Sequence, residues 1–201
     1  MFIRVDNQYV DEYMKNDYLL PIMNGQVKTV PREIIVTRTH QIMTMLKHCW
    51  KRAMFDTIYV GLKNKKILDV GGAYCGYLPL VEHNDYTLIE PDKEFKYLKQ
   101  FGAKVFSGKW EDFLLKESYD YITCCDVFLT NAKKLDVFLE KFLPHCKELR
   151  FTLTIRNIPK DRWSVDDLND LLCKYGIEDK IFYKDIGLPG NRNVYIISIK
   201  N

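Results

Sequence analysis

Acidic side chains and glycines alternate with short apolar runs between residues 65 and 112. Asp69 closely precedes Gly71, Gly72 and Gly76, and Glu90 stands 21 residues after Asp69. Glycines let a backbone turn tightly and approach a ligand closely. A carboxylate about 20 residues further on can accept hydrogen bonds from both ribose hydroxyls of a nucleotide. These residue types and their spacing predict a nucleotide-binding turn.

The apolar runs around these residues predict the elements that position them. Ile67, Leu68 and Val70 indicate a short buried strand that leads into the glycines. A helix beginning near Tyr77 would direct its free N–H groups and positive dipole end toward a ligand above the turn. A second strand over 86–89 ends at Glu90. Strand, glycine turn, helix and strand form a nucleotide-binding βαβ unit.

Two cofactors fit the turn. The pattern Gly71-x-Ala73-x-x-Gly76 is close to the dinucleotide fingerprint and suits a nicotinamide cofactor. The pair Asp69-x-Gly71 instead resembles the signature of class I S-adenosylmethionine-dependent methyltransferases. We favour S-adenosyl-L-methionine, because a dehydrogenase normally needs more chain for its substrate domain than remains here.

The same resemblance extends to a third predicted strand over 103–106. Glu111 and Asp112 follow that strand. In the methyltransferase family an acidic residue after the third strand contacts the adenine ring. The resemblance therefore implies that Glu111 or Asp112 binds the adenine and that Glu90 binds the ribose.

The remaining chain continues the alternation of strands and helices. A fourth strand over 119–126 places Asp126 at its carboxyl end, the edge where open α/β sheets bind ligands. Asp126 is thus a candidate for both cofactor binding and catalysis; capping the next helix is the alternative. Further elements are expected as a helix over 132–143, a strand over 149–155, a helix ending near 176, and strands over 180–186 and 194–200. The order resembles a Rossmann-like α/β fold, a mostly parallel sheet with an antiparallel last strand.

Residues 1–60 differ in character from residues 61–201. The first part begins as an irregular arm and then shows apolar residues at helical spacing from about 37 to 60. We expect an N-terminal arm and amphipathic helix packed on the core, followed by an S-adenosylmethionine-binding, methyltransferase-like domain over 61–201.

A fainter resemblance links the chain to FtsJ-like and viral cap ribose 2′-O-methyltransferases. The positions matching that family's catalytic tetrad carry Lys51 (or Lys47), Asp126, Arg156 and Asn193. The resemblance implies catalytic roles for Asp126, Lys51 and Arg156. Arg156 replaces a lysine, and a guanidinium stays protonated and cannot act as a base. The chain therefore uses different chemistry at the acceptor, takes a different substrate, or does not catalyse.

Basic residues are concentrated before the glycine turn. Lys28 to Lys66 contains nine Lys or Arg against two acidic residues, a net charge of +7, so the rest of the chain sums to −4 within the total of +3. Such a block suits an anionic partner such as RNA; a solvated helix face is the other interpretation. Two further functions stay open: a small-molecule or glycan methyltransferase with residues 1–60 as a lid, and an inactive methyltransferase-like partner subunit.

The composition of the chain indicates its domain count, the state of its cysteines and its cellular location. The chain has 201 residues, 47% of them hydrophobic, and suits one globular domain with a small appendage. Its six cysteines include no C-x-x-C pair, which favours free thiols in a reducing compartment over a disulfide framework or a metal site. No apolar run of 18 residues and no signal peptide is present, so we expect a cytoplasmic protein without a membrane partner.

Overall fold

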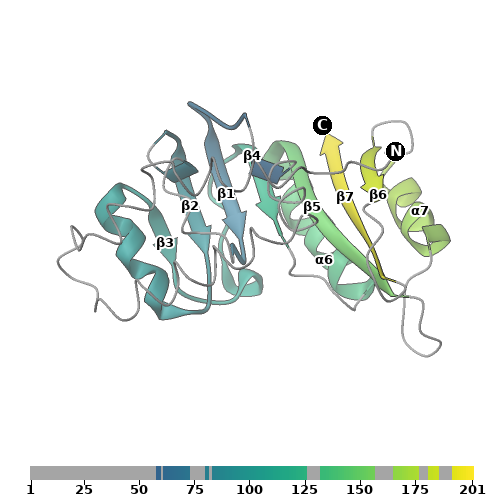
Figure 1. The fold of residues 1–201 in the computed structure, drawn as a ribbon, viewed down its shortest axis with the longest axis horizontal. Helices are drawn as coiled ribbons and strands as arrows, with labels where there is room; N and C mark the ends of the chain where they lie inside the picture. Colours follow the sequence, from purple (N-terminus) through teal and green to yellow (C-terminus); the bar gives the residue numbers. More distant parts are fainter. Residues whose placement is uncertain are drawn as a thin grey trace, which may run out of the picture.

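One seven-stranded sheet runs through the part of the chain that the computed structural model describes: residues 58–59, 61–72, 80–81, 83–125, 132–156, 165–176, 181–185 and 192–201. The strand order is β3-β2-β1-β4-β5-β7-β6, with β3 at one edge and β6 at the other (Figure 1). The strands are β1 (Lys66–Val70), β2 (Asp85–Ile89), β3 (Lys104–Phe106), β4 (Tyr119–Cys124), β5 (Cys146–Arg156), β6 (Ile181–Asp185) and β7 (Arg192–Lys200).

The direction of the strands confirms the predicted fold class. β1 pairs in parallel with β2 and β4, and the parallel pairing continues from β2 to β3 and from β4 to β5. β7 lies antiparallel between β5 and β6. Strands β2 and β3 are therefore added on one side of β1, and β4 and β5 on its other side. The last strand, β7, is antiparallel to its neighbours β5 and β6. The reversal between β1 and β4 is the switch point at which such sheets bind ligands.

Most predicted elements are found, with some shifted boundaries. Helices α6 (Ala132–Phe142) and α7 (Val165–Lys174) match the predicted ranges closely. Strand β5 begins at Cys146 rather than at Leu149, because its first residue pairs with Tyr119 of β4. Pairing with β4 thus extends β5 beyond the apolar run from which the strand was predicted.

A helix between β2 and β3 is an addition to the predicted elements. The nine residues of η1 (Lys93–Phe101) form a 3-10 helix. Phe95 and Leu98 are buried three residues apart. This interval suits a 3-10 helix, in which side chains at i and i+3 are aligned. Two shorter 3-10 helices are η2 (Trp110–Asp112) and η3 (Leu143–His145).

The main hydrophobic core lies between α6, α7 and one face of the sheet. Leu68, Ile122 and Phe151 contribute fully buried side chains from three strands. Trp110 of η2 packs edge to face against Phe138 of α6, with ring centroids 5.5 Å apart. Edge-to-face aromatic pairs of this kind add to the free energy gained from burial alone.

The predicted N-terminal arm and most of its amphipathic helix lie outside the described residues, as does most of the basic segment Lys28–Lys66. Ile58 and Tyr59, near the end of the predicted helix, are helical and buried. Within the described ranges, no helix has the length and apolar character needed to cross a membrane.

We predict that Phe138→Ala lowers the free energy of unfolding by about 3–5 kcal/mol, because it leaves a cavity beneath Trp110. Val137→Ala is the matched control, since this neighbouring side chain is 45% exposed; it should change the free energy by less than about 0.5 kcal/mol. Urea denaturation of both variants measures the difference. Equal losses in the two variants would contradict this description of the core.

Candidate functional site

The carboxyl ends of β1, β2 and β3 meet at one edge of the sheet. The N–H of Gly71 donates to the carbonyl of Ile89 over 2.8 Å, and the N–H of Glu90 donates to the carbonyl of Phe106 over 3.0 Å. These two bonds continue the parallel ladders by one residue. Gly71, Glu90 and Ser107, the residues that follow the three strands, therefore form a row, which we call the edge row.

Gly71 adopts a backbone conformation that favours glycine. Its φ is +63°, in the left-handed region, where a side chain would be strained. The turn after β1 therefore depends on this glycine. Gly72 follows it, whereas Ala73 and Gly76 lie outside the described residues.

Glu90 is half-buried at the centre of the edge row. Its Oε1 accepts a hydrogen bond of 3.2 Å from the backbone N–H of Asp92. The loop after β2 thus helps to hold the carboxylate in place. A carboxylate at this position can accept further hydrogen bonds from hydroxyl groups of a ligand.

Ser107, which follows β3, is a candidate site residue that the sequence did not reveal. Its Oγ is buried and has no hydrogen-bond partner among the described residues. Buried hydroxyls are normally paired, so an unpaired one at a ligand-binding edge marks a place where a ligand atom can bind. A serine after a short strand is commonplace, and only its position after β3 could have drawn attention to it.

Asp69 lies beneath the turn and is 1% exposed. Its Oδ2 accepts a hydrogen bond of 2.6 Å from the Tyr86 hydroxyl, and its Oδ1 accepts one of 2.8 Å from the Thr123 hydroxyl. The Tyr59 hydroxyl lies 3.0 and 3.3 Å from the two oxygens. The carboxylate thus joins β1 to β2, to β4 and to the segment before β1.

This environment changes the acidity of Asp69. Burial raises its pKa to about 6, and the nearby negative charge of Glu90 adds to the increase. The hydrogen bonds from Tyr86, Thr123 and Tyr59 act in the opposite direction, because they stabilise the charged form. The edge row and the buried carboxylate beneath it are therefore electrostatically linked.

Glu111 and Asp112, the residues predicted to contact adenine, lie in η2 and are exposed. Lys141 of α6 holds η2 by donating to the carbonyl oxygens of Trp110 and Glu111 over 2.9 and 2.8 Å. Asp112 borders a pocket against β3. η2 is thereby fixed to the α6 side of the sheet.

Of the three predicted catalytic residues, only Arg156 lies within the described part of the chain. Arg156 is the last residue of β5, opposite Arg192 of β7, at the carboxyl end of its strand like the residues of the edge row. Lys51 and Asp126 lie outside the described residues. The chain reaches Asp126 directly after the buried Cys125 at the end of β4.

No protein-family model and no curated protein sequence matches the chain. Solved structures resemble it at low identity. Magnesium protoporphyrin IX methyltransferase from Synechocystis with bound S-adenosylmethionine aligns over 100% of both chains, with a TM-score of 0.52 and 14% identity. The plantazolicin methyltransferase BpumL in complex with S-adenosylhomocysteine aligns over 96% of this chain and 99% of its own. The TM-score of this alignment is 0.53 and the sequence identity is 14%.

The N-methyltransferase NodS from Bradyrhizobium japonicum, in complex with S-adenosylhomocysteine, aligns over 98% of this chain and 99% of its own, with a TM-score of 0.51 and 13% identity. At these identities the likeness concerns the fold. The chain has the Rossmann-like fold of class I methyltransferases, as the glycine turn and the strand order predicted. A specific likeness to the FtsJ-like enzymes is not among these findings.

We predict that Asp69 makes stability fall as pH rises. The folded protein holds this proton up to about pH 6, whereas the ordinary pKa is 3.8. Stability should therefore decrease between about pH 4 and pH 6, and the total loss by pH 7 is about 3 kcal/mol. Asp69→Asn should abolish this decrease, as measured by urea denaturation from pH 3 to pH 7.

Asp136→Asn is the control for that experiment. Hydrogen bonds from Lys174 and Tyr175 lower the pKa of Asp136, so the wild type should gain stability relative to this variant as pH rises from 3. Identical pH profiles for the wild type and Asp69→Asn would contradict the description of Asp69.

Proposed function

We propose that this protein is an S-adenosylmethionine-dependent methyltransferase. The observation that carries the proposal is the edge row of Gly71, Glu90 and Ser107 on a sheet with the fold of structures solved with this cofactor or its product. Fold alone does not assign an activity. The proposal therefore depends on the fit between these residues and the cofactor.

The chemistry of the edge row suits the cofactor's nucleoside. Glu90 offers acceptors to two ribose hydroxyls, and the unpaired hydroxyl of Ser107 can bind a polar atom of the adenine. Gly71 and Gly72 let the backbone come close to the ligand, and Glu111 and Asp112 stay candidates for the adenine. Because the carboxylate of Asp69 is satisfied within the fold, we assign it the role of holding β1 beneath the turn.

S-adenosylmethionine supplies, when bound, a methyl group activated by its sulfonium. The protein then needs mainly to align the acceptor and to exclude water. We propose Asp126, two residues after the last residue of β4 in the sequence, as the side chain nearest the acceptor. Lys51 and Arg156 would orient the acceptor or bind its charge, a role suited to an arginine that cannot serve as a base.

We further propose RNA or another nucleic acid as the acceptor. The charge of +7 between Lys28 and Lys66, a segment that precedes the glycine turn in the sequence, supports a phosphate-binding role. A small-molecule acceptor is the second candidate, since magnesium protoporphyrin IX and plantazolicin appear in the names of enzymes with this fold. We also propose a cytoplasmic location, because six cysteines without a C-x-x-C pair suit a reducing compartment.

Glu90→Ala should weaken the binding of S-adenosylhomocysteine by about 1–3 kcal/mol, because it removes charge-assisted hydrogen bonds to the ribose. Asp85→Asn is the matched control, since Asp85 lies at the amino end of β2, whereas Glu90 follows the carboxyl end of the same strand. Titration calorimetry compares the two variants. An unchanged affinity in Glu90→Ala, or binding of NAD instead, would overturn the cofactor assignment.

RNA binding should depend steeply on salt if the basic segment contacts phosphates. The slope of log K against log salt should be about 0.7–0.9 for each neutralised phosphate. Replacing Lys47, Lys51 and Arg52 by Ala should reduce the slope by up to about three, while cofactor affinity stays unchanged. Filter binding at several salt concentrations measures both slopes, and an absent or salt-independent RNA signal would favour a small-molecule acceptor.

A further inference from the structure

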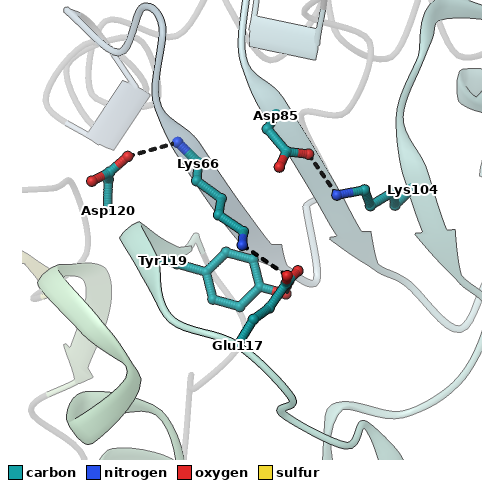
Figure 2. A network of polar contacts seen from close by, with 6 residues as sticks. All are labelled: Lys66, Asp85, Lys104, Glu117, Tyr119 and Asp120. Carbon is teal, nitrogen blue, oxygen red and sulfur yellow. Dashed lines mark hydrogen bonds and ion pairs between the residues drawn. The ribbon is translucent and has the colours of Figure 1, made fainter.

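The connection between β3 and β4 is attached to the rest of the fold by lysines of other elements. Near its start, Lys141 of α6 donates to two carbonyl oxygens of η2. Near its end, Lys66 of β1 pairs with Glu117 over 2.7 Å, as Figure 2 shows. Both side chains of this ion pair are partly exposed, so the pair contributes little to stability. The attachment at η2 is of a different kind, because its acceptors belong to the backbone.

Three side chains on one face of α6 hold η2. Phe138 and Phe142 pack against the indole ring of Trp110, with ring centroids 5.5 and 5.9 Å from it. Lys141 donates to the carbonyl oxygens of Trp110 and Glu111 over 2.9 and 2.8 Å. Residues three and four positions apart lie on the same side of an α-helix, as these three residues do. Helix α6 therefore fixes both the side chain and the backbone of η2.

Lys141 forms no ion pair with a carboxylate of the described residues. Burial lowers the pKa of its ammonium, and the negative charges of Glu111 and Asp112 act in the opposite direction. Neither of these two carboxylates pairs with another residue in the described part of the chain. Lys141 thus directs its donors to the backbone of η2 and leaves both carboxylates able to accept hydrogen bonds from a ligand.

Asp112 is the better placed of the two carboxylates. It borders the pocket of about 660 Å³ over Thr87 and β3, whereas Glu111 does not. Phe106 and Phe113 border the same pocket, and their rings pack edge to face with centroids 5.3 Å apart. A carboxylate beside aromatic rings suits a planar base that carries an amino group, because the rings pack against the base and the carboxylate accepts from its N–H.

We propose that Lys141 is a positioning residue that gives the site its preference for a base with an amino group. By holding η2 against α6, it keeps the carboxylate of Asp112 in place to accept a hydrogen bond from that amino group. This inference rests on the proposed function, in which the base is the adenine of the cofactor. Hypoxanthine has an oxo group at the same position, which is an acceptor and is repelled by a carboxylate. A loose η2 would have to be ordered by the ligand, and this cost would reduce the preference.

The first test measures whether Lys141 holds η2. The backbone N–H groups of Asp112 and Phe113 donate to carbonyl oxygens three residues earlier over 3.1 and 3.2 Å, so their hydrogen exchange reports on η2. Lys141→Met keeps a long side chain and removes the donors. We expect peptide 107–118 to exchange at least about threefold faster in this variant, with no change in β1. Equal exchange of this peptide in the wild type and the variant would overturn the proposal.

The second test measures the preference for the amino group. Titration calorimetry compares S-adenosylhomocysteine with S-inosylhomocysteine, in which an oxo group replaces the amino group. The wild type should prefer the first by at least about tenfold, the effect of one hydrogen bond to a charged acceptor. Lys141→Met should weaken S-adenosylhomocysteine about threefold to tenfold and leave S-inosylhomocysteine nearly unchanged. General destabilisation would instead weaken both ligands alike, and urea denaturation of the variant detects it.

Two further variants of lysines serve as controls. Lys134→Met, at an exposed lysine of the same helix, should match the wild type in both tests. Lys141→Arg keeps a cation with several N–H donors and should restore the preference to within about twofold of the wild type. An unchanged ratio of the two dissociation constants in Lys141→Met, or an equal change in Lys134→Met, would refute the role of Lys141 in base selection.

Variants of the two carboxylates identify the acceptor. Asp112→Ala should abolish the preference for the amino group, and adding Lys141→Met to it should have no further effect on the preference. Glu111→Ala is the matched control and should keep the preference. A preference that is lost in Glu111→Ala and kept in Asp112→Ala would overturn the assignment of Asp112.

The two tests separate this inference from the proposed function. If the wild type binds neither nucleoside, the cofactor assignment fails and the role in base selection fails with it. If the wild type binds S-adenosylhomocysteine and Lys141→Met shows the same preference, only the role of Lys141 is refuted. The exchange experiment needs no ligand, so in either case it decides whether Lys141 holds η2.

Discussion

A single buried carboxylate connects the elements on which the site depends. Asp69 accepts hydrogen bonds from Tyr59, Tyr86 and Thr123, which come from three different parts of the chain. Burying a charge without partners is costly, and these three donors offset much of that cost. The part of this desolvation cost that the donors do not offset raises the pKa of Asp69. The central strands therefore meet around a polar group whose partners must all be present together, and this requirement fixes β1 against β2 and β4.

The parallel ladders convert that central arrangement into a binding edge. Because β1, β2 and β3 run in the same direction and end in register, the residues that follow them come together as the edge row of Gly71, Glu90 and Ser107. Each contributes a different property, namely a tight turn, a carboxylate and an unpaired hydroxyl. Apolar side chains of the same strands pack against α6 and keep the edge rigid. Rigid strands position polar groups more accurately than loops do.

The connection between β3 and β4 gives the sheet a second feature. The only described helix in this connection is η2, three residues long, and an extended segment follows it. Such a segment covers less of a sheet face than a full α-helix, whose diameter with side chains is about 10–12 Å. The pocket over Thr87 lies in the space left there. Surface ion pairs border it, and they contribute little to the stability of the fold.

The sequence by itself determined the order of the strands, the fold class and the positions of the glycine turn and of Glu90. These features are local, since a short apolar run, a glycine or an acidic residue at a set interval is visible within about 20 residues. It did not determine the early start of β5 at Cys146, which depends on its partner strand. Nor did it reveal that Asp69 lies beneath the turn, because its hydroxyl partners are 10, 17 and 54 residues away. The unpaired Ser107 and the hold of Lys141 on η2 likewise came from tertiary structure alone, since burial and pairing arise only when distant segments pack together.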